Sequence, residues 1–228
     1  MKIMGKQVVT RRQVAGAGLL GLGLAMMPKT LAHATAAQFE GTYGGLGTAA
    51  PAPPLSSRDV LIERAKAALD AHADKFQLRD RIAIADFSRA SKDLRFHIVD
   101  LVDGRMNAYL VAHGKGSDPE HSGWLQRFSN VPDSEASSDG VFKTGEIYEG
   151  QHGQSMRLIG LDPTNDMAEP RAIVIHGASY VSENILASQG KLGRSQGCFA
   201  VAPHMLPQVL AMLGQGRMLY SGRLSDQV

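Results

Sequence analysis

The sequence predicts a mainly β domain with one helix before the strands and a second, short helix near its end. Three observations predict this fold class. Short apolar runs recur between residues 82 and 176, separated by glycine, proline and asparagine turns. Helical spacing of apolar residues precedes these runs and returns near the C-terminus. The composition, with 43% apolar and 20% charged residues in a chain of 228, is that of a globular protein.

Residues 1–34 have the pattern of an export signal. A basic start that includes Arg11 and Arg12 precedes an apolar, glycine-rich segment, and Ala32 and Ala34 form a small-x-small cleavage pattern. The arginine pair favours the twin-arginine route. The alternative is an uncleaved membrane anchor, but the apolar run of about 13 residues is short for a span of ~20. We therefore expect a periplasmic or cell-envelope protein with no stable membrane insertion after cleavage.

The basic excess of the chain lies in this first segment. The chain has 24 Lys and Arg and 22 Asp and Glu; five of the basic residues and none of the acidic ones fall in residues 1–34, which leaves −3 for the rest. A domain of that charge gives no reason to expect nucleic-acid binding. Residues 35–56 are rich in Gly, Pro and Ala and predict a flexible linker, so we expect the folded domain over residues 57–228.

A helix is expected first in this domain. Ser56 to Asp59 offer capping residues, and apolar side chains then recur on one helical face from Leu61 to Phe76. His72 falls on the same face, so we expect it to pack against the domain rather than bind a ligand.

Strand patterns and turn signals follow. Asp103–Gly104 between two apolar runs is a strong hairpin signal, and residues 114–139 read as a polar loop. A helix is expected over residues 203–213. The expected strands, in chain order, are 82–89, 96–101, 106–112, 141–148, 155–161, 171–176 and 217–221.

Cys198 is the only cysteine of the chain and lies in the segment GKLGRSQGCFAV. Exported domains normally pair their cysteines, so a single one is either buried and inert or a reactive thiol. Gly197 permits a turn that points successive N–H groups outward, which makes the amides of Gln196, Gly197 and Cys198 candidate oxyanion donors. His176 ends the apolar run AIVI and precedes Gly177, so it is the candidate base at the mouth of a buried strand.

The stretch AIVIHGASYVSE…GKLGRSQGCFAV resembles the murein L,D-transpeptidase catalytic domain, the YkuD-type domain, in a divergent branch. A strand ending in His-Gly, a loop and Ser-x-Gly-Cys, in that order, carry the resemblance, which is strong over residues 141–203 and extends back to residue 82. It implies a compact β-sandwich with a few helices. It also implies a cysteine acyltransferase that acts on peptidoglycan stem peptides and needs no cofactor.

The resemblance further implies roles for single residues. Cys198 would attack the carbonyl of the L-centre of diaminopimelate and expel the terminal D-alanine, and an amine of a neighbouring stem would take the thioester and form the cross-link. His176 would carry the proton, with the Gly177 carbonyl orienting its ring. Substrate carboxylates call for cations or N–H donors. The candidates for substrate binding are Arg194, Ser195, Tyr180, Ser179 and Arg157, of which Ser195 is expected mainly to stabilise the turn.

The chain departs from the family pattern at Gln196, where histidine is usual, at Ala200, where Asn or Arg is common, and in the long interval of 22 positions between histidine and cysteine. Alternative functions stay open. The same chemistry can serve hydrolysis, as an L,D-carboxypeptidase or an amidase that releases wall-linked protein, or the domain can bind the wall without catalysis. A zinc hydrolase using His152, His176 and His204 is disfavoured because no ligand-pair motif is present, so we expect no metal.

Overall fold

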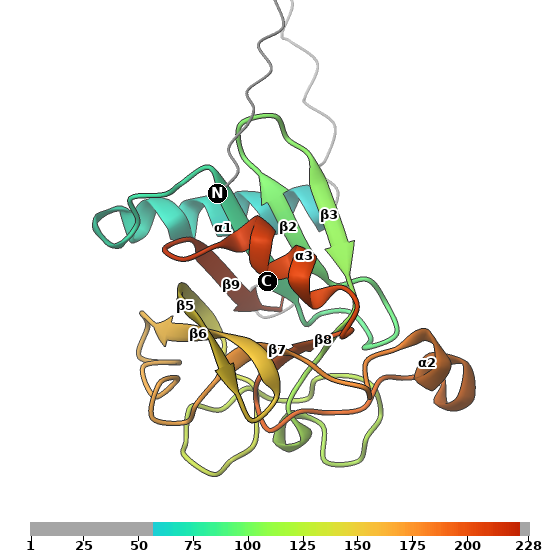
Figure 1. Ribbon diagram of the computed structural model, residues 1–228. Coiled ribbons are helices and arrows are strands. Elements are labelled where there is room, and N and C mark those ends of the chain that lie inside the picture. Colours follow the sequence, from blue (N-terminus) through green and yellow to red (C-terminus); the bar gives the residue numbers. More distant parts are fainter. Residues whose placement is uncertain (1–56, 224–228) are drawn as a thin grey trace, which may run out of the picture. The chain divides into compact units, whose positions relative to one another are not determined.

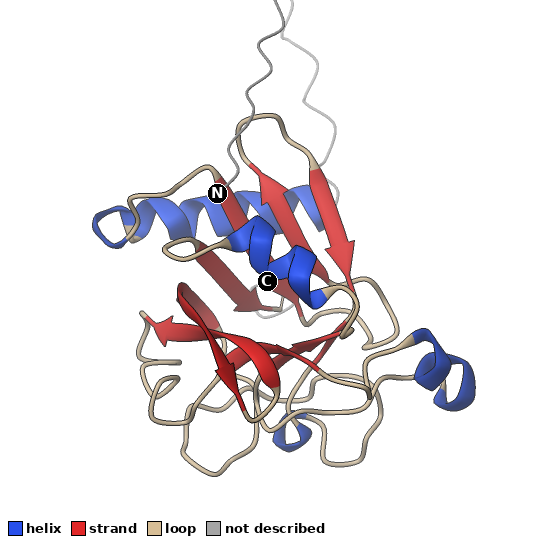
Figure 2. Cartoon of the chain, in the orientation of Figure 1, coloured by secondary structure: helices blue, strands red, loops and turns tan. Residues whose placement is uncertain are grey.

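The computed structural model describes residues 57–223, so the expected export signal, the expected linker and the last five residues lie outside the described range. Figures 1 and 2 show the arrangement of its helices and strands. Within residues 57–223, no helix has the length and apolar character needed to cross a membrane. In chain order the elements are α1 (Ser57–Ala71), η1 (Ala73–Lys75), β1 (Arg81–Asp86), β2 (Phe96–Asp100), β3 (Met106–Tyr109), β4 (Val111–Ala112), η2 (Lys115–Ser117), β5 (Gly140–Gly150), β6 (Gly153–Gly160), β7 (Val174–Gly177), α2 (Glu183–Gln189), β8 (Phe199–Val201), α3 (Leu206–Leu213) and β9 (Met218–Gly222).

The described strands form one mixed sheet in the order β3-β2-β1-β9-β5-β6-β7-β8-β4. The pairs β1–β9 and β7–β8 are parallel and the others antiparallel. β3 and β4 lie at opposite ends of this order, yet only Leu110 separates them in the chain. Two peptide steps span less than about 8 Å. The sheet must therefore curl until its two ends adjoin, which encloses a core.

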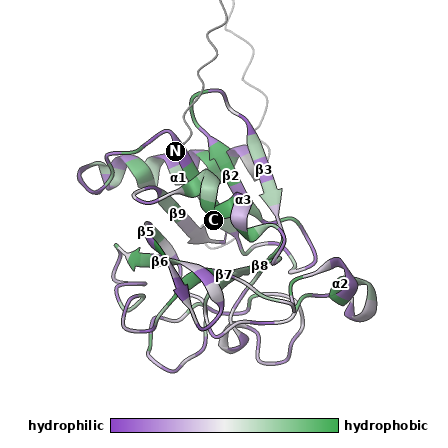
Figure 3. Ribbon diagram, viewed as in Figure 1, coloured by the Kyte–Doolittle hydropathy of each residue, from purple (hydrophilic) through white to green (hydrophobic). Residues whose placement is uncertain are grey.

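The main core fills the inside of this curled sheet. Apolar side chains of every second strand residue point into it, and α3 adds Leu206, Val209, Leu210 and Leu213. The rings of Phe142 and Phe199 meet edge to face, with centroids 5.5 Å apart. Figure 3 shows the apolar character of strands such as β2 and β7 in green.

A second apolar cluster covers the opposite face of β1 and β9. Leu61, Ala65 and Leu69 of α1 are at most 3% exposed and pack with Ile82 and Ile84 of β1. The alternate residues of β1 point into the main core instead. β1 is thus buried on both faces, with α1 on one side and α3 on the other (Figure 1).

The predicted class, a mainly β fold with a helix before the strands and a short one near the end, is confirmed. The expected helix is shorter than predicted, because it ends at Ala71. His72 follows the helix end, and its half-buried ring contacts the domain through Asp162 and bonds to the Ala68 carbonyl. The expected strand over 106–112 is divided at Leu110 into β3 and β4.

The expected strand over 171–176 begins only at Val174, because Ala172 has φ +52° in a turn. The elements α2, β8 and the short 3₁₀ helix η2 were not predicted.

Candidate active site

The register of β6, β7 and β8 decides which side chains share a face. Ser155 of β6 lies opposite His176 of β7, and Ala200 of β8 lies opposite His176 on the other side. Extending the parallel register by one residue places Cys198 opposite Val174. Because side chains alternate along a strand, His176 and Cys198 then lie on the same face, two positions apart. Ile175 and Phe199 occupy the opposite face and belong to the main core.

His176 is held by its own strand end. Its side chain is only 3% exposed, and Nδ1 lies 3.0 Å from the Gly177 carbonyl oxygen. Since a carbonyl can only accept, Nδ1 carries the proton and Nε2 is left with a lone pair. Burial lowers the pKa of His176 below 6.5; the bond to Gly177 opposes this shift and the nearby His152 adds to it. The ring is therefore a neutral base.

Cys198 stands in the turn before β8 with its side chain partly exposed. Its Sγ lies 3.6 Å from the Ala172 carbonyl oxygen, to which the thiol donates. Burial raises the pKa of Cys198 above 9.0, against the opposing effects of the Val174 N–H and the Arg171 charge. A partly exposed thiol with a histidine on the same face fits a nucleophile that a base must activate.

Ser195 stabilises the turn that presents the thiol. Its Oγ donates to the Cys198 carbonyl at 2.7 Å and accepts from the Gly197 N–H at 3.2 Å. The side chain is 4% exposed. The Gly197 amide, expected as an oxyanion donor, is thus engaged within the turn, and this leaves the amides of Gln196 and Cys198 as the candidates.

Gly197 is required by space as well as by conformation. Its φ is +111°, and a Cβ there would lie 2.7 Å from the Ala136 carbonyl oxygen and 2.9 Å from Cδ1 of Ile173. The turn is therefore pressed against the loop that carries Ala136.

Arg171 lies against this turn. It was not among the candidate residues chosen from the sequence. Its guanidinium donates to Ser138 Oγ at 2.7 Å and to the carbonyls of Ser129, at 2.8 Å, and Ala136. It comes within 3.1 Å of the position that a Gly197 Cβ would take, and its charge lowers the pKa of Cys198. It is bonded to a loop more than thirty residues earlier, and no local pattern of the sequence marks such a contact.

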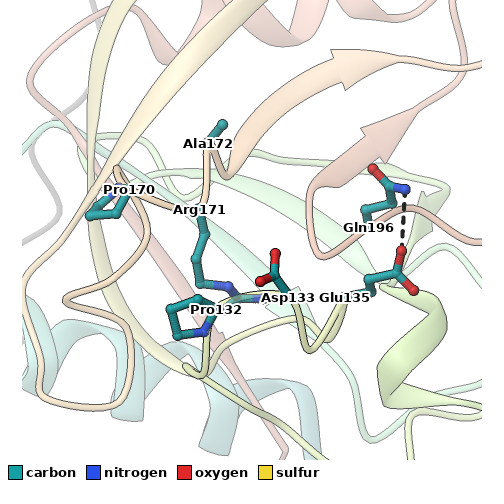
Figure 4. Close-up of a pocket in the computed structure, with 7 residues that line it drawn as sticks. All are labelled: Pro132, Asp133, Glu135, Pro170, Arg171, Ala172 and Gln196. Atoms are coloured by element: carbon teal, nitrogen blue, oxygen red, sulfur yellow. Dashed lines mark hydrogen bonds between the residues drawn. The ribbon is translucent and has the colours of Figure 1, made fainter.

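A pocket of about 340 Å³ opens beside the turn. Figure 4 shows its lining, with the Gln196 amide directed to Glu135, 3.2 Å away. Ala172, whose carbonyl accepts from Cys198, also lines it. The lining residues are Pro132, Asp133, Glu135, Pro170, Arg171, Ala172 and Gln196.

The expected substrate-binding residues have different surroundings. Arg194 donates to the carbonyls of Asp118 and Pro119. Arg157 bonds to Glu146 at 2.9 Å and lies over the Tyr148 ring.

Burial, and then the charge of Cys198, raises the pKa of Tyr180 to about 12. Ser179 is exposed in the turn after β7. Of these candidates, Tyr180 is thus the one that senses the charge of the thiol, while both arginines are held in other contacts.

His152 lies in the tight turn between β5 and β6. In the structure its ring stacks on that of His176. No group of three or more His, Cys, Asp or Glu side chains suited to a metal ion occurs within residues 57–223.

The fold and the site together define a class: a mainly β protein with a cysteine and a carbonyl-bonded histidine on one face of adjacent parallel strands. The family model described as "L,D-transpeptidase catalytic domain" matches residues 56–221. The chain belongs to the L,D-transpeptidase catalytic domain family, and the predicted resemblance is confirmed.

The solved structures that match this chain include an L,D-transpeptidase from Mycobacterium smegmatis, at 13% identity, TM-score 0.38 and 63% coverage of this chain. Another is an L,D-transpeptidase from Stackebrandtia nassauensis, at 14% identity, TM-score 0.37 and 69% coverage. The present chain covers 58% and 63% of the length of those two proteins. No curated protein matches the sequence.

Proposed function

We propose that this domain is a cysteine-dependent L,D-transpeptidase that acts on peptidoglycan stem peptides. The observation that carries the proposal is the placement of Cys198 and His176 on one face of β7 and the turn before β8, with His176 Nδ1 bonded to Gly177. That bond leaves Nε2 free of a proton and ready to accept one. Membership of the family supports the reaction class.

In the first half-reaction the Cys198 side chain rotates about its Cα–Cβ bond, which breaks the hydrogen bond between the thiol and the Ala172 carbonyl. The thiol then gives its proton to His176 Nε2. Sγ adds to the carbonyl carbon at the L-centre of diaminopimelate, and the amides of Gln196 and Cys198 donate to the oxyanion. The C–N bond to the terminal D-alanine breaks, the His176 proton passes to the departing amine, and a thioester remains.

In the second half-reaction an amine of a neighbouring stem attacks the thioester, His176 takes a proton from that amine, and the thiol is restored with a new amide bond. The pocket beside Ala172 supports this step. Of the two acids in its lining, Glu135 is paired with Lys115 at 2.7 Å, so the Asp133 carboxylate is the group that suits a substrate ammonium. Water in place of the amine would give the hydrolytic products of a carboxypeptidase.

We also propose that the protein acts in the cell envelope, after export directed by residues 1–34 and with residues 35–56 as a linker. Its substrate lies in the wall, and the composition of both segments supports this location.

The test is intact-protein mass spectrometry of the mature chain after incubation with purified muropeptides that contain diaminopimelate. We expect an adduct that maps to Cys198, disappears in Cys198→Ala and leads to cross-linked dimers. Trimmed stems without dimers would assign hydrolysis instead. If a folded protein with a free, reduced thiol forms no adduct, the catalytic proposal fails and a wall-binding role replaces it.

A further inference from the structure

The tip of the β5–β6 hairpin reaches the ring of His176. Gly150 pairs with Gly153 at the end of the hairpin, so His152 sits in the tight turn between them. The rings of His152 and His176 are stacked, with centroids 4.3 Å apart and an interplanar angle of 23°. Ser155 lies opposite His176, so the turn extends past the end of β7 and lies against the histidine.

This contact covers one face of the His176 ring. The residue is on the face of β7 turned away from the main core, yet its side chain is only 3% exposed. The hydrogen bond from Nδ1 to the Gly177 carbonyl holds one edge of the ring. One bond at an edge fixes the position of that edge but leaves the plane of the ring free to tilt. A second ring against the face removes that freedom.

We propose that His152 is a positioning residue for His176. It fixes the plane of the His176 ring so that Nδ1 stays on Gly177 and Nε2 faces the thiol. The inference rests on the proposed function for its effect on turnover, but its effect on the His176 ring is independent of any substrate. His152 itself touches neither the thiol nor the substrate in this proposal.

The charges around His176 give the contact a second consequence. Titratable and charged groups reach this face from three elements: His152 from the hairpin, Cys198 from the turn before β8, and Arg157 from β6. Arg157 is turned to Glu146 at 2.9 Å and stacked over Tyr148, so His152 is the group that bears most directly on the ring. A neutral His152 stacks favourably on the imidazolium formed during catalysis, whereas a protonated one repels it.

The experiment compares His152→Ala, His152→Phe and, as a matched control on the same exposed turn, Gln151→Ala. Two properties are measured on each folded variant. The first is the ¹⁵N shifts of the two His176 ring nitrogens over pH, which report tautomer and titration without substrate. The second is kcat and KM with muropeptide substrates.

We expect His152→Ala to lower kcat about tenfold with little change in KM, because a tilted base transfers the proton poorly. In this variant His176 should populate both neutral tautomers and titrate at higher pH, because water then reaches the ring. His152→Phe keeps a flat ring and should retain kcat within about threefold of the wild type. Gln151→Ala should match the wild type in both measurements.

Two results would overturn the inference. One is a His152→Ala variant whose His176 tautomer, titration and kcat all equal those of the wild type. The other is a His152→Phe variant as impaired as His152→Ala, which would mean that the imidazole takes part in the reaction. If the wild type forms no acyl adduct, the proposed function fails, and the ring shifts alone then decide whether His152 positions His176.

Discussion

Cys198 and His176, the two side chains proposed to exchange a proton, are both neutral at pH 7. Burial raises the pKa of the thiol above 9.0 and lowers the pKa of the imidazole below 6.5. The resting site is therefore a thiol beside a neutral imidazole rather than a thiolate–imidazolium pair. In the proposed mechanism the proton passes from sulfur to nitrogen during attack, and the histidine acts as a general base.

This protonation state predicts the pH dependence of turnover. In the proposed mechanism only neutral His176 can take the thiol proton, so activity should fall as pH drops through its lowered pKa. We expect the acid limb of kcat/KM with muropeptides to have its midpoint below pH 6.5. The measurement is a pH–rate profile from pH 4 to 9. A midpoint above pH 6.5 would mean that the pKa of the catalytic base is raised rather than lowered, and would contradict this prediction.

Gly197 provides a test of the turn that holds the thiol. Gly197→Ala adds a methyl group against the Ala136 carbonyl and forces a non-glycine residue to φ +111°. Strain and overlap together should cost about 2–4 kcal/mol of unfolding free energy. The matched control is Gly104→Ala, at φ +74° with no atom within 4 Å of the added Cβ, which should cost about 1 kcal/mol. Urea unfolding measures both, and equal losses would refute the packing argument.

At the scale of elements, the site is assembled from strand ends and loops that the sheet brings together. β7 supplies His176, the turn before β8 supplies Cys198, and the β5–β6 hairpin covers the histidine. Arg171, just before β7, ties the thiol turn to the loop that contains Ser129 and Ala136. The contribution of that arginine is both geometric and electrostatic.

Replacing Arg171 separates these two contributions. Arg171→Met removes the charge that lowers the pKa of Cys198, so the thiolate fraction at pH 8 falls and alkylation by iodoacetamide should slow by roughly threefold to tenfold. Arg171→Lys keeps the charge but loses the forked hydrogen bonds, so alkylation should slow less while the loop loosens. Hydrogen exchange of the backbone amides of residues 129–138 measures how far the loop loosens. Equal alkylation rates in all three proteins would show that the charge does not act on the thiol.

Long elements with clear periodicity were predictable, and those that depend on distant contacts were not. Leu61, Ala65 and Leu69 mark α1 by their spacing, and Asp103–Gly104 marks its hairpin. α2 had a usable signal that was overlooked: Ser182 caps it by accepting from the Ile185 N–H, and a left-handed Gly190 ends it.

β4 and β8 are too short to show a period, since pairing alone makes them strands. The same limit applies to the site. His176, Gly177 and Cys198 could be chosen from the sequence because they belong to a recognisable motif, a strand that ends in His-Gly followed by Ser-x-Gly-Cys. The contacts made by Arg171 and His152 exist only in the folded chain.

At the scale of the whole molecule, a network of buried polar side chains connects the interior to the turn that carries Cys198. Arg95, His113 and Asp118 are at most 1% exposed. Arg95 donates to His113 Nδ1 at 2.8 Å, and His113 Nε2 lies 3.3 Å from Asp118. The His113 carbonyl in turn accepts from the Ser195 N–H. The network thus connects the interior to the thiol turn.

This network predicts loss of stability in acid. Burial and the Arg95 charge lower the pKa of His113 from 6.5 to about 4. A lowered folded-state pKa stabilises the protein above pH 6.5, and that stability is lost as pH falls from 6.5 toward 4, by at most about 3 kcal/mol. Urea unfolding at several pH values measures this slope. His113→Gln, which cannot titrate, should flatten it; an unchanged slope would place the effect in other groups.

The position of β9 has a consequence for how the chain is made. β9 pairs with β1 on one side and β5 on the other, so the centre of the sheet is closed by a strand from residues 218–222. Until those residues have left the ribosome, the edges of β1 and β5 that pair with β9 stay unpaired, and the nascent chain cannot complete its core. The domain must therefore acquire its fold after synthesis of that segment, and a chain terminated before residue 218 would present two open edges to any other chain nearby.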